Sequence, residues 1–69
     1  MGDLSEQHDL PPLMDGWKRC TGKSGPREGL WHIQLRQGFA DTRVAYAPAA
    51  FKWIWQYHAG DVVAVRRVD

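Results

Sequence analysis

Hydrophobic and polar residues alternate in several short stretches of this chain, which is the pattern of β-strands. Over residues 30–36, tryptophan, isoleucine and leucine occupy the odd positions, and the even positions 32, 34 and 36 are polar. This predicts a half-buried strand with one face in solvent. Gln37-Gly38 is then a hairpin turn, and a second strand follows with Thr42, Val44 and Tyr46 on one face. The two stretches predict an antiparallel pair.

The densest pattern lies in residues 51–57, where four aromatic side chains occupy every second position. This spacing predicts a strand that carries four rings on one face of a sheet. A helix from Pro48 to Gly60 is the alternative, because Pro48 suits a first helical position and 51, 54, 55 and 58 recur at helical spacing. The complete alternation favours the strand, and a single helical turn near Pro48 fits either interpretation.

Two further stretches complete the predicted fold. Trp17–Cys20 reads as a short first strand, and Val62–Val68 as a closing strand whose residues 62–65 are apolar on both faces. The sequence therefore predicts a mainly β fold: a small antiparallel sheet or partly open barrel of three to four strands in up-and-down order. Both sides of the sheet are therefore expected to be covered by a partner or by a second copy of the chain; the alternative is a central strand buried within the monomer.

Length limits the core that this chain can form. A 69-residue chain is one domain at most and buries only about 60% of its unfolded surface. Cys20 is the single cysteine, so no disulfide can form within the chain. Self-association is a usual aid for such small domains, and we therefore expect a homodimer.

Charge divides the chain into two parts. Residues 1–15 contain four acidic and no basic residues, whereas residues 16–69 contain nine basic and four acidic residues, a net charge of +5. All eight aromatic residues lie between Trp17 and Tyr57. We interpret residues 1–14 as a disordered acidic tail, either a solubilising leader or a segment that folds on a partner, and residues 15–69 as the domain.

No targeting or membrane segment is expected. The N-terminus is acidic and lacks the apolar run of a signal peptide, and no stretch approaches the roughly 18 apolar residues of a membrane span. A cytoplasmic location follows as the expectation.

Catalytic, cofactor and metal sites are not predicted. Gly22-Lys23-Ser24 resembles the end of a phosphate-binding loop, but position 17, where the motif needs glycine, is tryptophan. The candidate metal ligands are scattered and lack the close pairs of zinc sites: His8, Cys20, His32 and His58. Cys20 with His32 or His58 lacks the local motif of a nucleophile and base. We therefore predict a protein that is not an enzyme.

Aromatic residues with basic neighbours are the remaining candidate for function. Rings beside a positive groove can stack the bases of single-stranded nucleic acid, and Trp, Tyr and Arg also dominate protein interfaces. Two functions stay open on these grounds, a protein-binding module and a nucleic-acid-binding module. The candidate partner-binding residues are Arg36, Arg43, Lys52, Trp53, Trp55, Tyr57, Arg66 and Arg67.

Residues 15–68 resemble a group of short proteins encoded by tailed phages and prophages. The similar motifs are Asp15-Gly16-Trp17, Arg36-Gln37-Gly38, the aromatic segment Trp53–His58 and the run Asp61–Arg66. The chain departs from the pattern at Gln37, where aspartate is usual, and at Val65, where tyrosine is usual. The resemblance implies an accessory protein in the bacterial cytoplasm that binds and modulates a host protein. Inhibitors of defence systems, including anti-CRISPR proteins, are a known subset of such proteins.

Overall fold

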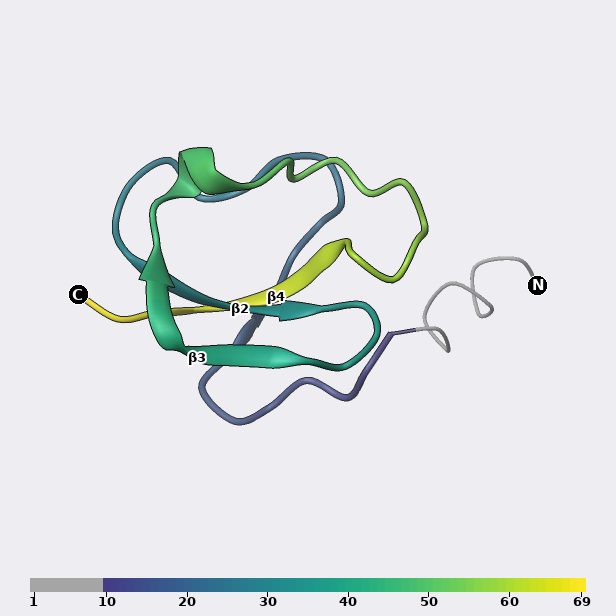
Figure 1. The fold of residues 1–69 in the computed structure, drawn as a ribbon, viewed down its shortest axis with the longest axis horizontal. Coiled ribbons are helices and arrows are strands. Elements are labelled where there is room, and N and C mark those ends of the chain that lie inside the picture. Colours follow the sequence, from purple (N-terminus) through teal and green to yellow (C-terminus); the bar gives the residue numbers. More distant parts are fainter. Residues whose placement is uncertain (1–9) are drawn as a thin grey trace.

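The structure, a computed structural model, describes residues 10–69 and forms a four-stranded antiparallel sheet. The strands are β1 (Lys18–Arg19), β2 (Trp31–Leu35), β3 (Ala40–Tyr46) and β4 (Val62–Arg67), in the order β1-β4-β2-β3 (Figure 1). The predicted mainly β class and antiparallel sheet are confirmed, and the sheet is open. The predicted up-and-down order is wrong, because β4 lies between β1 and β2.

The apolar run of β4 explains its central place in the sheet. Val62, Val63, Ala64 and Val65 are each at most 4% exposed. A strand that is apolar on both faces is stable only where other parts of the chain cover both of its faces. Figure 1 shows residues 47–60 on one side of the strands and residues 10–17 on the other. The alternative of a central strand buried within the monomer is therefore confirmed.

The predicted strand at residues 51–57 is absent, although its alternation is real. Phe51, Trp53 and Trp55 pack against the core cluster of Cys20, Ile33, Val62 and Val65, while Lys52, Ile54 and Gln56 are exposed. We call residues 51–57 the aromatic segment.

The aromatic segment is attached by separate hydrogen bonds and not by a strand ladder. The indole Nε1 of Trp53 donates to the Pro48 carbonyl and that of Trp55 to the Val62 carbonyl, each at 2.9 Å. The backbone N–H of Trp55 donates to the Gly22 carbonyl at 3.0 Å. The predicted helical turn near Pro48 is confirmed as the 3₁₀ helix η1 (Pro48–Ala50). The alternative helix to Gly60 is wrong, because the chain is extended again at Phe51.

The Gly22–Gly25 loop serves the packing of the tryptophans. A Cβ atom at Gly22 would lie 2.6 Å from the Trp55 ring, and one at Gly25 would overlap the Trp53 ring. The two glycines let the loop backbone approach both ring faces closely. The glycines that make this loop resemble a phosphate-binding loop are thus explained by its close packing against the two tryptophan rings.

A large bulge interrupts β3, so the predicted alternation over residues 41–46 is wrong. Ile33 pairs with Asp41 and Trp31 pairs with Tyr46, which leaves residues 42–45 opposite His32 alone. The Tyr46 hydroxyl donates to Asp41 Oδ2 at 2.7 Å, and the Arg43 N–H donates to Oδ1 at 3.1 Å. The hydrogen bond from Tyr46, together with that from Arg43, lowers the pKa of Asp41. The Asp41 carboxylate thus closes the bulge.

The predicted acidic tail lies mostly outside the described residues. Residues 1–9 are not described, and Leu10–Met14 lie against the domain, where Arg19 Nη2 donates to the Pro11 carbonyl at 2.6 Å. Across residues 10–69, none of the helical structure has the length and apolar character of a membrane span.

Candidate binding site at the Tyr57 turn

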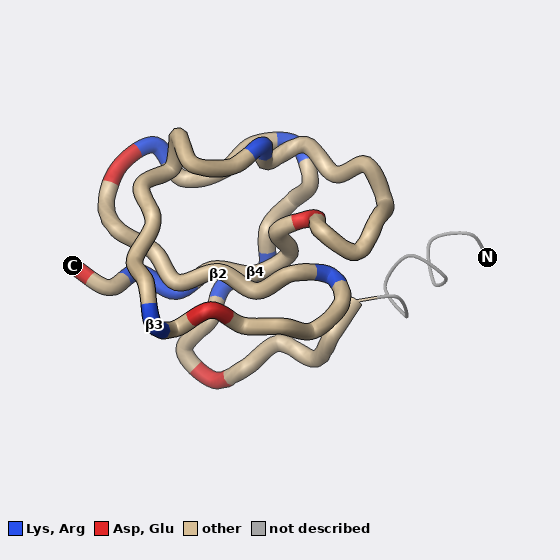
Figure 2. The backbone as a smooth tube through the Cα atoms, in the orientation of Figure 1, with Lys and Arg blue, Asp and Glu red and all other residues tan. Residues whose placement is uncertain are grey.

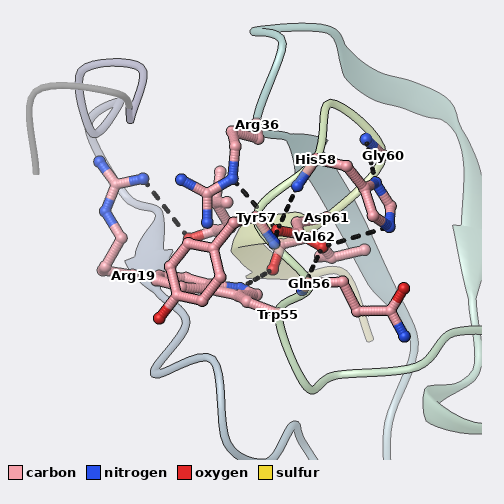
Figure 3. A network of polar contacts seen from close by, with 10 residues as sticks. Arg19, Arg36, Trp55, Gln56, Tyr57, His58, Gly60, Asp61 and Val62 are labelled. Carbon is pink, nitrogen blue, oxygen red and sulfur yellow. Dashed lines mark hydrogen bonds and ion pairs between the residues drawn. The ribbon is translucent and has the colours of Figure 1, made fainter. Parts of the chain in front are cut away.

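The buried carboxylate of Asp61 organises the turn that precedes β4. Its side chain is 3% exposed and accepts hydrogen bonds from three successive backbone N–H groups (Figure 3). The donors are Gln56 at 3.0 Å, Tyr57 at 2.8 Å and His58 at 3.3 Å. We call residues 56–60 the Tyr57 turn. One buried carboxylate thus accepts bonds from three consecutive amides, which stabilises the conformation of this turn.

Arg36 completes the coordination of Asp61. Its Nε donates to Asp61 Oδ2 at 3.1 Å, and its side chain is only 9% exposed. Burial alone would raise the pKa of Asp61, but the N–H groups of the turn and the Arg36 guanidinium outweigh this effect and lower it. Asp61 is therefore ionised at neutral pH.

The Arg36 guanidinium also lies over two aromatic rings. Its central carbon is 4.9 Å from the centroid of the Trp55 ring and 5.2 Å from that of the Tyr57 ring. These distances are in the range of cation–π interactions. Nη2 of Arg36 is buried and has no hydrogen-bond partner within residues 10–69. Arg36 thus links β2 to the aromatic segment and to the carboxylate of Asp61.

Tyr57 combines a strained backbone with an exposed ring. Its φ angle is +60°, the only positive value at a non-glycine residue within residues 10–69. A bulky residue in this region is a genuine outlier and costs on the order of 1–3 kcal/mol. Tyr57 nevertheless remains 60% exposed. The bonds to Asp61 therefore stabilise a conformation that presents an aromatic ring to solvent.

The β2–β3 turn lies beside the Tyr57 turn. The Gln37 N–H donates to the Ala59 carbonyl at 3.3 Å, and the Arg36 N–H donates to the Asp61 carbonyl at 2.8 Å. Phe39 on this turn is 49% exposed. Figure 1 shows both turns at the same end of the molecule. We call this end, with Tyr57 and Phe39 as its exposed rings, the Tyr57 face.

The structure brings together three of the predicted site residues and separates the others. Arg36, Trp55 and Tyr57 form one cluster. Trp53 packs beside Gly25 inside the domain, and Lys52 is exposed on the outer side of the aromatic segment.

The remaining three arginines lie on different surfaces. Arg43 is in the bulge of β3, Arg66 lies over Trp17 at 5.4 Å, and Arg67 lies over Trp31 at 5.8 Å. Figure 2 shows Lys and Arg spread over strands and loops. Within residues 10–69, the predicted partner-binding residues therefore do not gather in one cluster.

Asp61 and the conformation of Tyr57 are the features that sequence reasoning missed. His58 to Asp61 has the composition of a turn, and an aspartate in a turn can accept bonds from nearby backbone amides. This property of aspartate is the sequence signal that could have identified Asp61 as the acceptor for the turn. Nothing in the sequence marks Tyr57 for a positive φ angle, because aromatic residues disfavour it.

Cys20 and the histidines do not form a reactive group. Burial raises the pKa of Cys20 to about 11, so the thiol stays protonated at neutral pH. His32 Nδ1 contacts Arg66 at 2.8 Å, and His58 contacts Gly60 and Asp61. Within residues 10–69, no three His, Cys, Asp or Glu side chains lie where they could hold one metal ion. His8 lies outside the described residues.

No protein-family model, curated protein or solved structure matched this chain. Function is therefore inferred from the geometry of the Tyr57 face and from the chemistry of its residues.

Proposed function

We propose that this chain is a non-enzymatic accessory protein of a phage or prophage that binds a host protein and modulates or inhibits it, with the Tyr57 face as the contact surface. The observation that carries the proposal is the exposed Tyr57 ring, which a strained turn holds in place over Arg36. Inhibition of a bacterial defence system is one form that this activity can take.

The residue types and their rigidity support a protein partner. Tyrosine, tryptophan and arginine are the most frequent hot-spot residues of protein interfaces. A ring whose backbone is already fixed loses little conformational entropy on binding, so more of its contact energy becomes affinity. Tyr57 has both properties, because Asp61 fixes its backbone and Arg36 supports its ring.

The alternative of a nucleic-acid-binding module is less well supported. Base stacking needs free ring faces on an exposed surface. Trp53 and Trp55 instead pack on the core and against the Gly22–Gly25 loop, and their N–H groups donate within the domain. The rings of the aromatic segment are therefore used for folding, and Tyr57 alone among them is mainly exposed.

Affinity capture tests the proposal. The tagged chain is incubated with bacterial host lysate, with nuclease added to one half, and the retained proteins are identified by mass spectrometry. We expect a stoichiometric host protein that survives nuclease. Partners that disappear with nuclease, together with oligonucleotide binding that weakens steeply with salt, would instead establish the nucleic-acid module.

A substitution then links the captured protein to the Tyr57 face. Tyr57→Gly removes the ring and also removes the backbone strain, so the domain is expected to stay folded. The loss of a hot spot should weaken binding on the order of 30-fold. Val44→Ser is the matched control, since Val44 is 49% exposed and lies in the bulge of β3. Equal capture by Tyr57→Gly and the native chain would refute this interface.

A further inference from the structure

A groove beside Trp31 is a concave surface of the domain. The end of β4, the β1 strand and the loop at residues 24–28 line it, together with Trp31, and its volume is about 430 Å³. Ligand sites in proteins usually measure about 300–1,000 Å³. The groove shares no lining residue with the Tyr57 turn or the β2–β3 turn. It is therefore a separate candidate site.

The charge of the groove is predominantly positive. Its lining residues include four basic side chains and one acidic side chain: Lys18, Arg19, Arg27, Arg67 and Glu28. Lys18 and Arg27 are exposed and have no hydrogen-bond or ion-pair partner among residues 10–69. By contrast, Arg19 donates to backbone carbonyls and Arg67 donates to Asp69. Lys18 and Arg27 are thus the cations available to a ligand.

The inner wall of the groove is apolar. Cys20 and Val65 are buried, and Trp31 is half-buried with its Nε1 donating to the Glu28 carbonyl at 2.7 Å. An occupant that fits this lining carries an apolar group with negative charges on either side. A purely polar anion would leave the apolar wall unused.

We infer that this groove binds an acidic polypeptide segment, whose carboxylates meet Lys18 and Arg27 while an apolar side chain contacts Val65 and Trp31. This assignment is independent of the proposed role of the Tyr57 face. The segment belongs to a partner protein and gives that partner a second point of contact. Charge complementarity between two unpaired cations and carboxylates is the basis of the choice.

Trp31 and Glu28 argue for a peptide over a nucleic-acid strand. One side of the Trp31 ring packs against the core, and the Arg67 guanidinium lies over the ring at 5.8 Å. A base therefore finds no open ring on which to stack. Glu28 would repel a continuous phosphate backbone, whereas separate carboxylates can lie away from it.

Fluorescence anisotropy tests the assignment with the whole chain. The probe is a fluorescein-labelled decapeptide in which leucine residues alternate with pairs of glutamates. A peptide with glutamine in place of glutamate and a labelled oligothymidylate serve as comparisons. We expect the acidic peptide to bind, the glutamine peptide to bind at least about tenfold more weakly, and the acidic peptide to lose affinity as salt rises.

Charge reversal locates the bound peptide. The double variant Lys18→Glu/Arg27→Glu should weaken binding of the acidic peptide by about tenfold or more, because two attractions become repulsions. Arg43→Glu is the matched control, since Arg43 is exposed on β3 and does not line the groove. Should the double reversal alter the unfolding midpoint, Lys18→Gln/Arg27→Gln is measured in its place, with weaker binding again expected.

Three results would overturn the assignment. They are equal binding of the acidic and glutamine peptides, tighter binding of oligothymidylate than of the acidic peptide, and equal affinities of the groove variant and Arg43→Glu. Tyr57→Gly should bind the acidic peptide like the native chain. A failure of host-protein capture through the Tyr57 face is thereby distinguished from a failure of the groove.

Discussion

Asp61→Asn is expected to destabilise the domain strongly, because it removes the charge that pairs with Arg36. The substitution keeps the size of the side chain but replaces one carboxylate oxygen with an NH₂ group. An amide that accepts at the Oδ2 position would direct that NH₂ group toward the Gln56 N–H, which now donates to Oδ1 at 3.0 Å. The buried guanidinium of Arg36 would also lose its counter-charge.

The size of the effect follows from the burial of the pair. Breaking a buried ion pair by removing one partner typically costs about 3–5 kcal/mol. Since asparagine can still accept some of the backbone bonds, we expect a loss of about 3 kcal/mol. A domain of this size has a free energy of unfolding of about 3–9 kcal/mol, so the loss takes up a large part of it. The expected fall in Tm is about 12–24 °C.

Urea unfolding followed by tryptophan fluorescence measures this loss, with the native chain and Asp69→Asn as references. Asp69 also contacts an arginine, but its side chain is 43% exposed, and solvent screening leaves little stability to lose. Arg36→Met in the Asp61→Asn background should recover part of the loss, because the unpaired charge is removed. A change below about 1 kcal/mol for Asp61→Asn would refute the central role of this carboxylate.

The same carboxylate makes stability depend on pH. The folded-state pKa of Asp61 lies below its ordinary value of 3.8, so the folded state favours the ionised form. Its contribution to stability is present above the unfolded pKa and is lost as pH falls through the folded pKa. Asp61→Asn should therefore flatten the acid limb of the stability curve, and an unchanged limb would contradict the lowered pKa.

Two further predictions concern the core. Gly25→Ala should destabilise the domain by about 1–3 kcal/mol in the same urea assay, because the new Cβ would overlap the Trp53 ring. Gly25 does not have a positive φ angle, so backbone strain adds nothing to this loss, and a loss below about 0.5 kcal/mol would contradict the packing explanation. Cys20 should react slowly with iodoacetamide at pH 8 in the native chain and rapidly in urea, because its thiol pKa is raised to about 11. Equal rates in the two states would show that burial does not protect the thiol.

Local periodicity predicted most of the strands correctly. Residues 31–35 and 62–67 form strands where the sequence placed them. The alternation gives the correct inward and outward side chains for residues 51–56 but is wrong for Tyr57, which is exposed. Periodicity reports which side of an extended segment is buried, but it contains no information about hydrogen-bond partners. The aromatic segment and a true strand therefore have the same sequence signature.

The site was less predictable than the fold, for a physical reason. Arg36, Trp55 and Tyr57 were identified as binding residues by their type, yet Arg43, Arg66 and Arg67 were grouped with them although they lie elsewhere. Arg43 lies elsewhere because of the bulge of β3, and Arg66 and Arg67 because of the central position of β4. The central position of β4 depends on its pairing with strands far away in the sequence, and the Asp41 bonds that close the bulge have no periodic sequence pattern.

The bulge of β3 also affects how copies of the chain could meet. An open sheet presents two edges, and a regular edge invites strands of other molecules to pair with it and aggregate. On one edge, residues 42–45 break the regular row of N–H and C=O groups; on the other, β1 contains only Lys18–Arg19. Continuation of the sheet from copy to copy is therefore disfavoured. The predicted homodimer would have to form through side-chain faces, which leaves its two sheets separate.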